Sequence, residues 1–170
     1  MDNFASCLAF VLQVEGGYSD NPADPGNWTG GIVGAGELRG TKSGVSAAAY
    51  PGLDIRNLTQ QQIEDIYRQD YFAPVQGEAL ALPLAMVAFD AAVNAGVRRS
   101  IVWLQQSAGV AADGVLGDKT LNVLSTGNAL ELASEALARR LDFYARSPGW
   151  GSFGLGWTRR VLKLAQAIEQ

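Results

Sequence analysis

The sequence predicts a mainly α-helical protein with a small lobe built from a β-hairpin and loops. Apolar residues recur at helical spacing through most of the chain, and helix-start signals precede several of these segments. Residues 19–46 differ, because they are rich in glycine, proline, asparagine and aspartate. A hydrophobic content of 48% with 18% charged residues is typical of a folded globular protein, and 170 residues suffice for a real core.

The first predicted helix ends at a single glutamate, Glu15. Asp2 is its expected N-cap, and Gly16 and Gly17 supply the residues at which helices commonly end. Glu15 therefore lies in the last turn, where the helix macrodipole is negative. This position suits a carboxyl group that keeps its proton near neutral pH. Cys7 falls on the apolar stripe of the same helix, so we expect a buried structural thiol.

The polar stretch at 19–46 predicts a long loop with short strands at 31–34 and 44–46. It carries two aspartates. Turn chemistry alone can explain an aspartate before proline or glycine, and we favour it for Asp20. For Asp24, a turn and a functional role stay equally open.

Four further helix starts follow. They are the capping box Thr59-x-x-Gln62, Pro83 in a first turn, and the capping residues Asp118 and Asn128. We expect the helix after Asn128 to be the longest in the core, and residues 147–157 to form a glycine-rich aromatic loop. Trp150 and Phe153 in that loop either stack on sugar rings or tuck beneath the loop.

Asp90 and Asn94 place two polar side chains on one face of an otherwise apolar helical segment, because they are four residues apart. Two interpretations stay open. The side chains form hydrogen bonds that fix helix packing, or they line a substrate cleft.

The absence of histidine argues against several catalytic chemistries. The chain has no His and one Cys, which removes Ser-His-Asp and Cys-His catalysis in their usual forms and argues strongly against a zinc site with ordinary ligands. We expect no metal and no cofactor, so carboxylate chemistry remains. The net charge of −4 also argues against nucleic acid as a partner.

Three motifs carry a resemblance to a known family: Glu15-Gly16-Gly17-Tyr18, Asp24-Pro25-Gly26 and Thr41-Lys42-Ser43-Gly44-Val45-Ser46. They resemble the N-terminal motif of glycoside hydrolase family 108, the peptidoglycan muramidases found among phage endolysins and bacterial secretion activator proteins. The Glu-x8-Asp spacing is also similar to that of phage lysozymes. Residues 28–40 depart from the pattern as an insertion, so Thr29 competes with Thr41 for the third catalytic position.

A second resemblance covers 94–96, 103–106 and 113–121, which look like the predicted peptidoglycan-binding segment that accompanies this family. The same residues are explicable as a helix–turn–helix staple without a ligand. In that interpretation Gly114 and Gly117 adopt positive φ, and Asp118 caps a helix from Lys119. We expect a catalytic region at 1–88 and a binding-like region at 89–170, packed into one domain.

The resemblance implies a lysozyme-like fold and hydrolysis of the β-1,4 bond between N-acetylmuramic acid and N-acetylglucosamine. Glu15 would be the general acid, Asp24 the ionised carboxylate, and Thr41 or Thr29 the residue that holds the attacking water. The residues expected to bind the glycan strand are Tyr18, Trp28, Thr29, Asp90 and Asn94. Two alternatives are a non-catalytic peptidoglycan-binding or secretion-accessory protein, and a lytic transglycosylase.

The N-terminal apolar segment lacks the features of a secretory signal, because Asp2 replaces the usual basic residues and no small-residue cleavage site follows. We therefore expect synthesis in the cytoplasm and action on the periplasmic wall after holin-type or dedicated export. No apolar run reaches membrane-spanning length. We expect a monomer.

Overall fold

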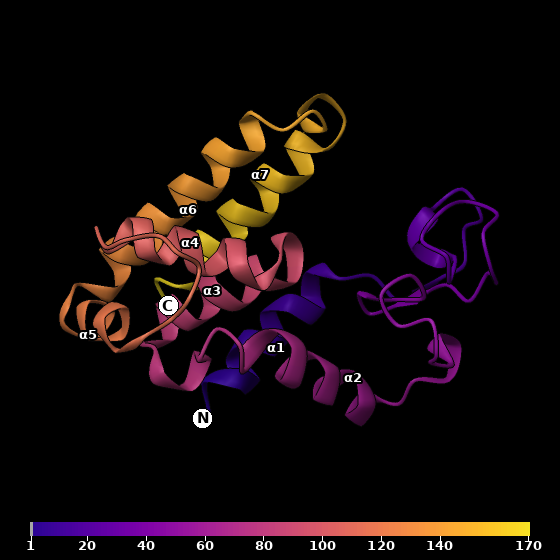
Figure 1. Cartoon of the computed structure of the whole chain (residues 1–170), viewed down its shortest axis with the longest axis horizontal. Helices are drawn as coiled ribbons and strands as arrows, with labels where there is room; N and C mark the ends of the chain where they lie inside the picture. Colours follow the sequence, from indigo (N-terminus) through magenta and orange to yellow (C-terminus); the bar gives the residue numbers. More distant parts are fainter. Residues whose placement is uncertain (1) are drawn as a thin grey trace. The chain divides into compact units, whose positions relative to one another are not determined.

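The computed structural model describes residues 2–170 and is mainly α-helical with one small antiparallel sheet, as predicted (Figure 1). None of the helices in this described range is long and apolar enough to cross a membrane. The α-helices are α1 Asn3–Val14, α2 Gln60–Tyr67, α3 Leu82–Ala95, α4 Val97–Ser107, α5 Asp118–Thr126, α6 Ala129–Ala145 and α7 Trp150–Ala167.

The chain forms two compact units. One is Leu8–Tyr67, and the other combines the residues up to Cys7 with Arg68–Gln170. The division into 1–88 and 89–170 that the sequence analysis expects stays a prediction.

The Leu8–Tyr67 unit contains a three-stranded sheet of very short strands. Its strands are β1 Tyr18–Ser19, β2 Thr41–Lys42 and β3 Val45–Ser46, all antiparallel in the order β1-β2-β3. The predicted strand at 44–46 is confirmed. The one at 31–34 is wrong, because this segment forms a turn in which Ile32 is 67% and Val33 53% exposed. A two-residue apolar run inside a glycine-rich loop has no partner strand to pair with.

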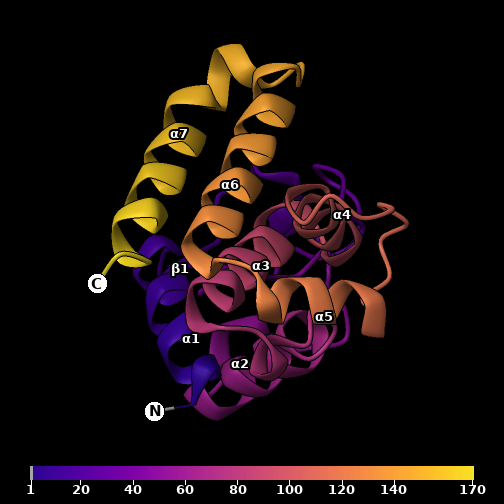
Figure 2. The ribbon, with the colours of Figure 1, turned by 90° about the vertical axis from the view of Figure 1, so that its left-hand side faces the viewer.

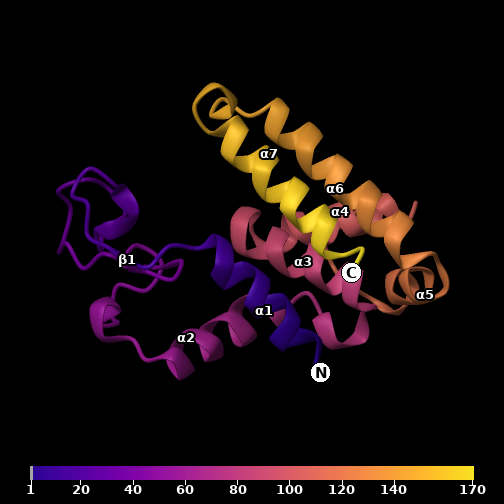
Figure 3. The ribbon, with the colours of Figure 1, turned by 180° about the vertical axis from the view of Figure 1, so that it is seen from behind.

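The larger unit is organised around α3, which is buried from Leu84 to Ala92. Small residues let neighbouring helices approach it closely, and α3 packs against α4 and α6. Figures 2 and 3 show α6 and α7 side by side, and these two helices also pack together. The start of α1 joins this unit through Phe4, which makes edge contacts with Phe72 and Phe89 at centroid distances of 5.1 and 6.0 Å.

The helix caps follow the sequence signals closely. Asp2 accepts a hydrogen bond from the Ala5 amide at 2.8 Å, and Asn128 caps α6. The buried environment of Cys7 raises the pKa of its thiol to about 12, chiefly through desolvation, so the thiol stays neutral and inert. The buried structural thiol is thus confirmed.

The C-terminal segment departs from the prediction, because α7 begins at Trp150 and takes in most of the expected loop. The indole of Trp150 lies against Gly154 one turn later, where a Cβ would collide with it. Trp157 stacks on Tyr144 of α6 at 4.8 Å, and Phe153 contacts Trp157. This aromatic packing offsets the low helix propensity of the glycines. With 18 residues, α7 is also longer than α6, which has 17.

A side chain from α4 holds the turn at 113–117 in place through hydrogen bonds. Gln105 is 1% exposed, donates to the Asp113 carboxylate at 2.7 Å and accepts from the Gly114 amide at 2.8 Å. The Gln105 hydrogen bond lowers the pKa of Asp113. Gly114 has positive φ as predicted, whereas Gly117 does not, and α5 begins at Asp118 with Gly117 as its N-cap. The segment is thus built as a structural turn.

A buried charge cluster ties three helices of this unit together. Asp90 of α3 is fully buried and accepts from Arg140 of α6 at 2.6 Å and from Arg160 of α7 at 2.8 and 2.9 Å. Asn94, one turn later, accepts a hydrogen bond from the Tyr144 hydroxyl. The buried Asp90 therefore holds helices in register, which favours the packing interpretation for this residue. Asn94 is exposed, and for it both interpretations stay open.

We expect Asp90→Asn to lower the free energy of unfolding by about 3 kcal/mol or more, because it removes the buried negative charge that pairs with both guanidinium groups. Asp142→Asn is the matched control, since its ion pair with Arg146 is exposed on both sides. It should change stability by less than about 1 kcal/mol. Denaturant unfolding followed by circular dichroism measures both. Equal effects of the two substitutions would show that the buried cluster is not a stabilising contact.

Candidate active site

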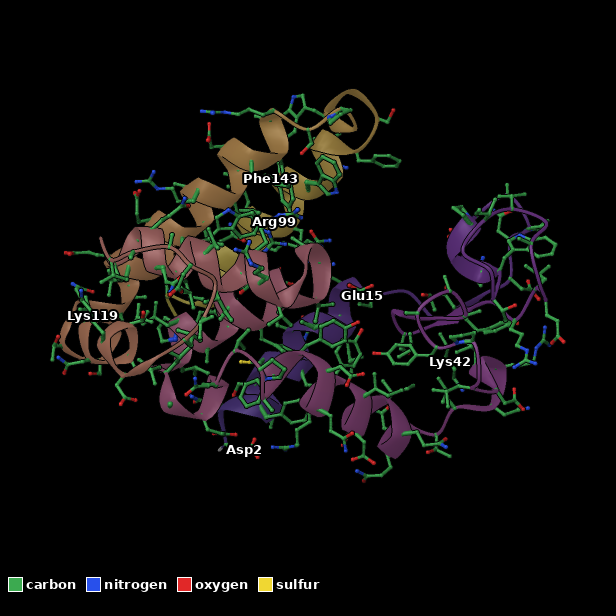
Figure 4. All side chains as sticks on the ribbon, in the orientation of Figure 1. Asp2, Glu15, Lys42, Arg99, Lys119 and Phe143 are labelled. Atoms are coloured by element: carbon green, nitrogen blue, oxygen red, sulfur yellow. The ribbon has the colours of Figure 1, made fainter. Side chains whose placement is uncertain are left out.

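Glu15 lies at the end of α1, as the sequence predicts, directly after its last residue. Its amide donates to the Val11 carbonyl at 3.0 Å, so the backbone still follows the helix. Figure 4 labels the side chain at this helix end. Gly16 and Gly17 then lead into β1, and the Glu15 side chain is half-buried.

The turn between β2 and β3 lies against the Glu15 carboxyl group. Ser43 and Gly44 both have positive φ, 47° and 79°, as a tight two-residue hairpin requires. A Cβ on Gly44 would come within 3.2 Å of Glu15 Oε2 and would collide with the Tyr67 hydroxyl. Glycine at this position therefore permits the hairpin to approach the carboxyl group closely.

Tyr67, the last residue of α2, fixes this turn from the other side. Its side chain is 2% exposed, and its hydroxyl donates to the Ser43 carbonyl at 2.8 Å. Tyr67 was not among the site residues expected from the sequence. A buried tyrosine must find a partner for its hydroxyl, and this is the signal that could have pointed to a further role.

Thr41 of β2 is held by a buried asparagine that the sequence analysis did not single out. The Thr41 hydroxyl donates to Asn27 Oδ1 at 2.7 Å, and Asn27 Nδ2 donates to the Asn21 carbonyl at 3.0 Å. Asn27 is fully buried. Because the Thr41 proton is committed to Asn27, its oxygen presents lone pairs to any other group. Thr41 also pairs with Ser19 of β1, the strand that follows Glu15.

Asp24 begins the short 3₁₀ helix η1, Pro25–Asn27, which ends at that same asparagine. Asp24 Oδ1 accepts from the Gly26 amide at 2.8 Å, so the turn chemistry considered for it is present. The residue is nevertheless exposed, and a carboxylate in this polar loop is accessible to a ligand.

Trp28 and Thr29 use their polar atoms to build the insertion. The Trp28 indole donates to the Pro22 carbonyl at 2.9 Å, and Thr29 Oγ1 accepts from the Glu37 amide at 2.9 Å. Trp28 is also bridged to Leu38 at the base of the loop. Both residues thus close the loop on itself.

Tyr18 of β1 is partly exposed and packs its ring on Gly40, where a Cβ would collide with it. The Arg56 guanidinium lies over the ring, 4.7 Å from its centroid, and pairs with Asp20 at 2.9 Å. Tyr18, with a smaller contribution from Asp20, raises the pKa of Arg56, so this side chain is always cationic. The turn expected at Asp20 stays a prediction.

The Leu8–Tyr67 unit thus contains six of the predicted site residues: Glu15, Tyr18, Asp24, Trp28, Thr29 and Thr41. Asp90 and Asn94 belong to the other unit, where Asp90 has no exposed surface with which to contact a ligand. Within residues 2–170, His, Cys, Asp and Glu form no group of three or more that could hold a metal ion.

Comparisons with known proteins point to one family. The model of the family described as glycosyl hydrolase 108 matches residues 8–96. The structure of SagA from Brucella abortus is similar to this chain with a TM-score of 0.81 and 31% sequence identity, over 97% of this chain and 92% of SagA. A search of curated proteins found no match.

The Gly44 contact generates a prediction about stability. Gly44→Ala should lower the free energy of unfolding by about 2 kcal/mol or more, because it adds a steric collision to a left-handed backbone. Gly34→Ala is the matched control: Gly34 has φ 82° but nothing within 4 Å of an added Cβ. It should cost only about 1 kcal/mol, measured in the same denaturant titration. Indistinguishable losses would argue against close packing at Gly44.

Proposed function

The chain belongs to glycosyl hydrolase family 108, and we propose that it is an N-acetylmuramidase. Its substrate is the glycan strand of peptidoglycan, and the bond it hydrolyses is the β-1,4 bond between N-acetylmuramic acid and N-acetylglucosamine. The mainly helical, lysozyme-like fold and the family match over all of the Leu8–Tyr67 unit support this proposal.

The observation that carries the proposal is the position of Glu15. Its carboxyl group lies at the negative end of α1, half-buried against the Gly44 turn. In the proposed mechanism this carboxyl group gives a proton to the leaving glycosidic oxygen. As that oxygen departs, the sugar acquires oxocarbenium character that a second carboxylate can stabilise.

We assign the second carboxylate to Asp24 and the water-holding residue to Thr41. Asp24 is exposed in a polar loop, where its carboxyl group is accessible to a substrate. The Thr41 hydroxyl donates its hydrogen bond to Asn27, so its oxygen can accept a hydrogen bond from a water molecule and orient that water. The strand pairing of Thr41 with β1 supports it over Thr29, whose hydroxyl serves the outer loop.

The substrate lies outside the cytoplasmic membrane, so the proposal includes a route to the wall. We propose that a holin-type lesion or a dedicated exporter provides it, for a protein that acts as a monomeric endolysin or wall-remodelling enzyme.

Glu15→Gln tests the acid. It is nearly isosteric but has no proton of the right acidity, so we expect hydrolysis to fall by a factor of about 100 or more. The measurement is the release of new reducing ends from purified sacculi. Glu169→Gln, at an exposed position near the C-terminus, is the control and should keep wild-type activity.

Three outcomes would contradict the proposal. Activity of Glu15→Gln above a few per cent would exclude the acid role. Products with 1,6-anhydro ends, detected by mass spectrometry, would identify a lytic transglycosylase. Binding of wild-type protein to sacculi without release of any product would identify a non-catalytic wall-binding protein.

The two threonines provide a second test. Thr41→Ala should lower kcat by roughly tenfold or more, the effect of losing one positioned hydrogen bond. Thr29→Ala should keep kcat within about threefold, since its hydroxyl only caps a loop amide. Thermal unfolding of each variant separates loss of activity from loss of fold. The reverse ranking would move the water-holding role to Thr29.

A further inference from the structure

A second feature of the Leu8–Tyr67 unit is an open pocket of about 500 Å³ that contains none of the proposed catalytic residues. It is formed by three segments: β1 and the residue after it, the end of the insertion, and the chain around the short helix η2, Ile55–Asn57. Its lining residues are Tyr18, Asp20, Leu38, Arg39, Gly52, Asp54 and Arg56. We call it the Arg56 pocket. It presents two guanidinium groups and two carboxylates, so it is strongly polar without a large net charge.

The ion pair inside the pocket is available for exchange. The side chains of Arg56 and Asp20 are 65% and 52% exposed, and their nitrogen and oxygen lie 2.9 Å apart. An exposed pair of this kind contributes little to stability. A ligand carboxylate can therefore take the place of Asp20 on Arg56, which leaves Asp20 ready to accept a cationic group of the same ligand. Arg56 is then paired with the ligand carboxylate and Asp20 with the ligand cation, so both residues keep a partner of opposite charge.

The pocket walls are held in place before any ligand binds. Lys42 of β2, labelled in Figure 4, donates to the carbonyls of Arg56 at 3.1 Å and Leu58 at 2.7 Å. Arg39 donates to the Pro51 carbonyl at 3.0 Å, and Asn57 donates to the Asp54 carboxylate at 2.9 Å. A preorganised site loses less conformational entropy on binding than one that must fold around its ligand.

The pocket is joined to the proposed catalytic residues by short stretches of chain. Tyr18 follows Glu15 after two glycines, and Arg39 precedes Thr41 by two residues. In peptidoglycan, the stem peptide branches from the muramic acid whose glycosidic bond is cleaved. That peptide carries free carboxylates, and where its third residue is a diamino acid such as diaminopimelate, a carboxylate and an ammonium share one carbon atom.

We propose that the Arg56 pocket binds the zwitterionic amino-acid group of the stem peptide. Its carboxylate pairs with Arg56, and its ammonium with Asp20 or Asp54. Arg39 stays paired with Glu37 at 2.7 Å and forms part of the pocket wall. Bidentate guanidinium–carboxylate geometry and a facing acid together select a zwitterion over a simple anion. This inference rests on the proposed function, because it takes the peptide as a branch of the substrate.

The first experiment compares two substrates, glycan strands that carry stem peptides and the same strands stripped of peptides by an amidase. Arg56→Gln should lower kcat/KM on the peptide-bearing strands by about tenfold, the loss of one charge-assisted hydrogen bond, and should leave the stripped strands unchanged. Arg146→Gln is the matched control, because it removes an arginine from an exposed ion pair in the other unit. It should behave as wild type on both substrates.

The second experiment measures binding without catalysis. The full-length Glu15→Gln protein is titrated with a free stem tetrapeptide that contains diaminopimelate, and with the same peptide containing lysine, which lacks the side-chain carboxylate. We expect binding of the first peptide to be at least about tenfold tighter, and added Arg56→Gln or Asp54→Asn substitutions to remove the difference. Thermal unfolding confirms that each variant is folded.

The outcomes separate the two proposals. The pocket inference is wrong if wild type cleaves both kinds of strand and Arg56→Gln lowers kcat/KM equally on both or on neither. It is also wrong if the two peptides bind with equal affinity. In either case the hydrolase proposal survives. If wild type cleaves neither strand, the hydrolase proposal is wrong, and the peptide titration alone decides the pocket.

Discussion

The close approach of the β2–β3 turn to the Glu15 carboxyl group is the constraint on which the site depends. It requires a residue without a Cβ at position 44, a left-handed backbone there, and a tyrosine from α2 that holds the neighbouring carbonyl. The turn covers one side of the Glu15 carboxyl group and limits its contact with water. The carboxyl group also lies at the negative end of the α1 macrodipole. Asp24, by contrast, is exposed, and its Oδ1 accepts a hydrogen bond from the Gly26 amide.

Burial decides what the same residue types do in different parts of this protein. Asp90 and Arg140 are removed from water and Arg160 nearly so, and the pairing of these charges serves helix packing. Asp20 and Arg56 make a pair of similar length at the surface, where the interaction is weak and exchangeable. The first arrangement stabilises a core and the second can serve recognition. The sequence around each aspartate does not distinguish them.

The helices and their caps were largely predictable, because a cap such as Asn128 and an apolar stripe are both local features. Local rules failed where side chains distant in sequence override them. The glycines after Trp150 are helical because aromatic rings from α6 and α7 pack over them, and Ile32 and Val33 are exposed because no strand lies beside them. Tertiary packing outweighs propensities of about 1 kcal/mol per residue.

The sequence by itself determined the chemistry that is possible. A chain without histidine cannot use Ser-His-Asp or Cys-His catalysis, and a glutamate between an amphipathic helix and two glycines is expected at a helix end. The tertiary structure alone decided which groups surround that glutamate and its partners. Tyr67 meets Ser43 across 24 residues, Asn27 meets Thr41 across 14, and Arg56 meets Asp20 across 36. Such contacts depend on how loops close in three dimensions, and no periodicity along the chain encodes them.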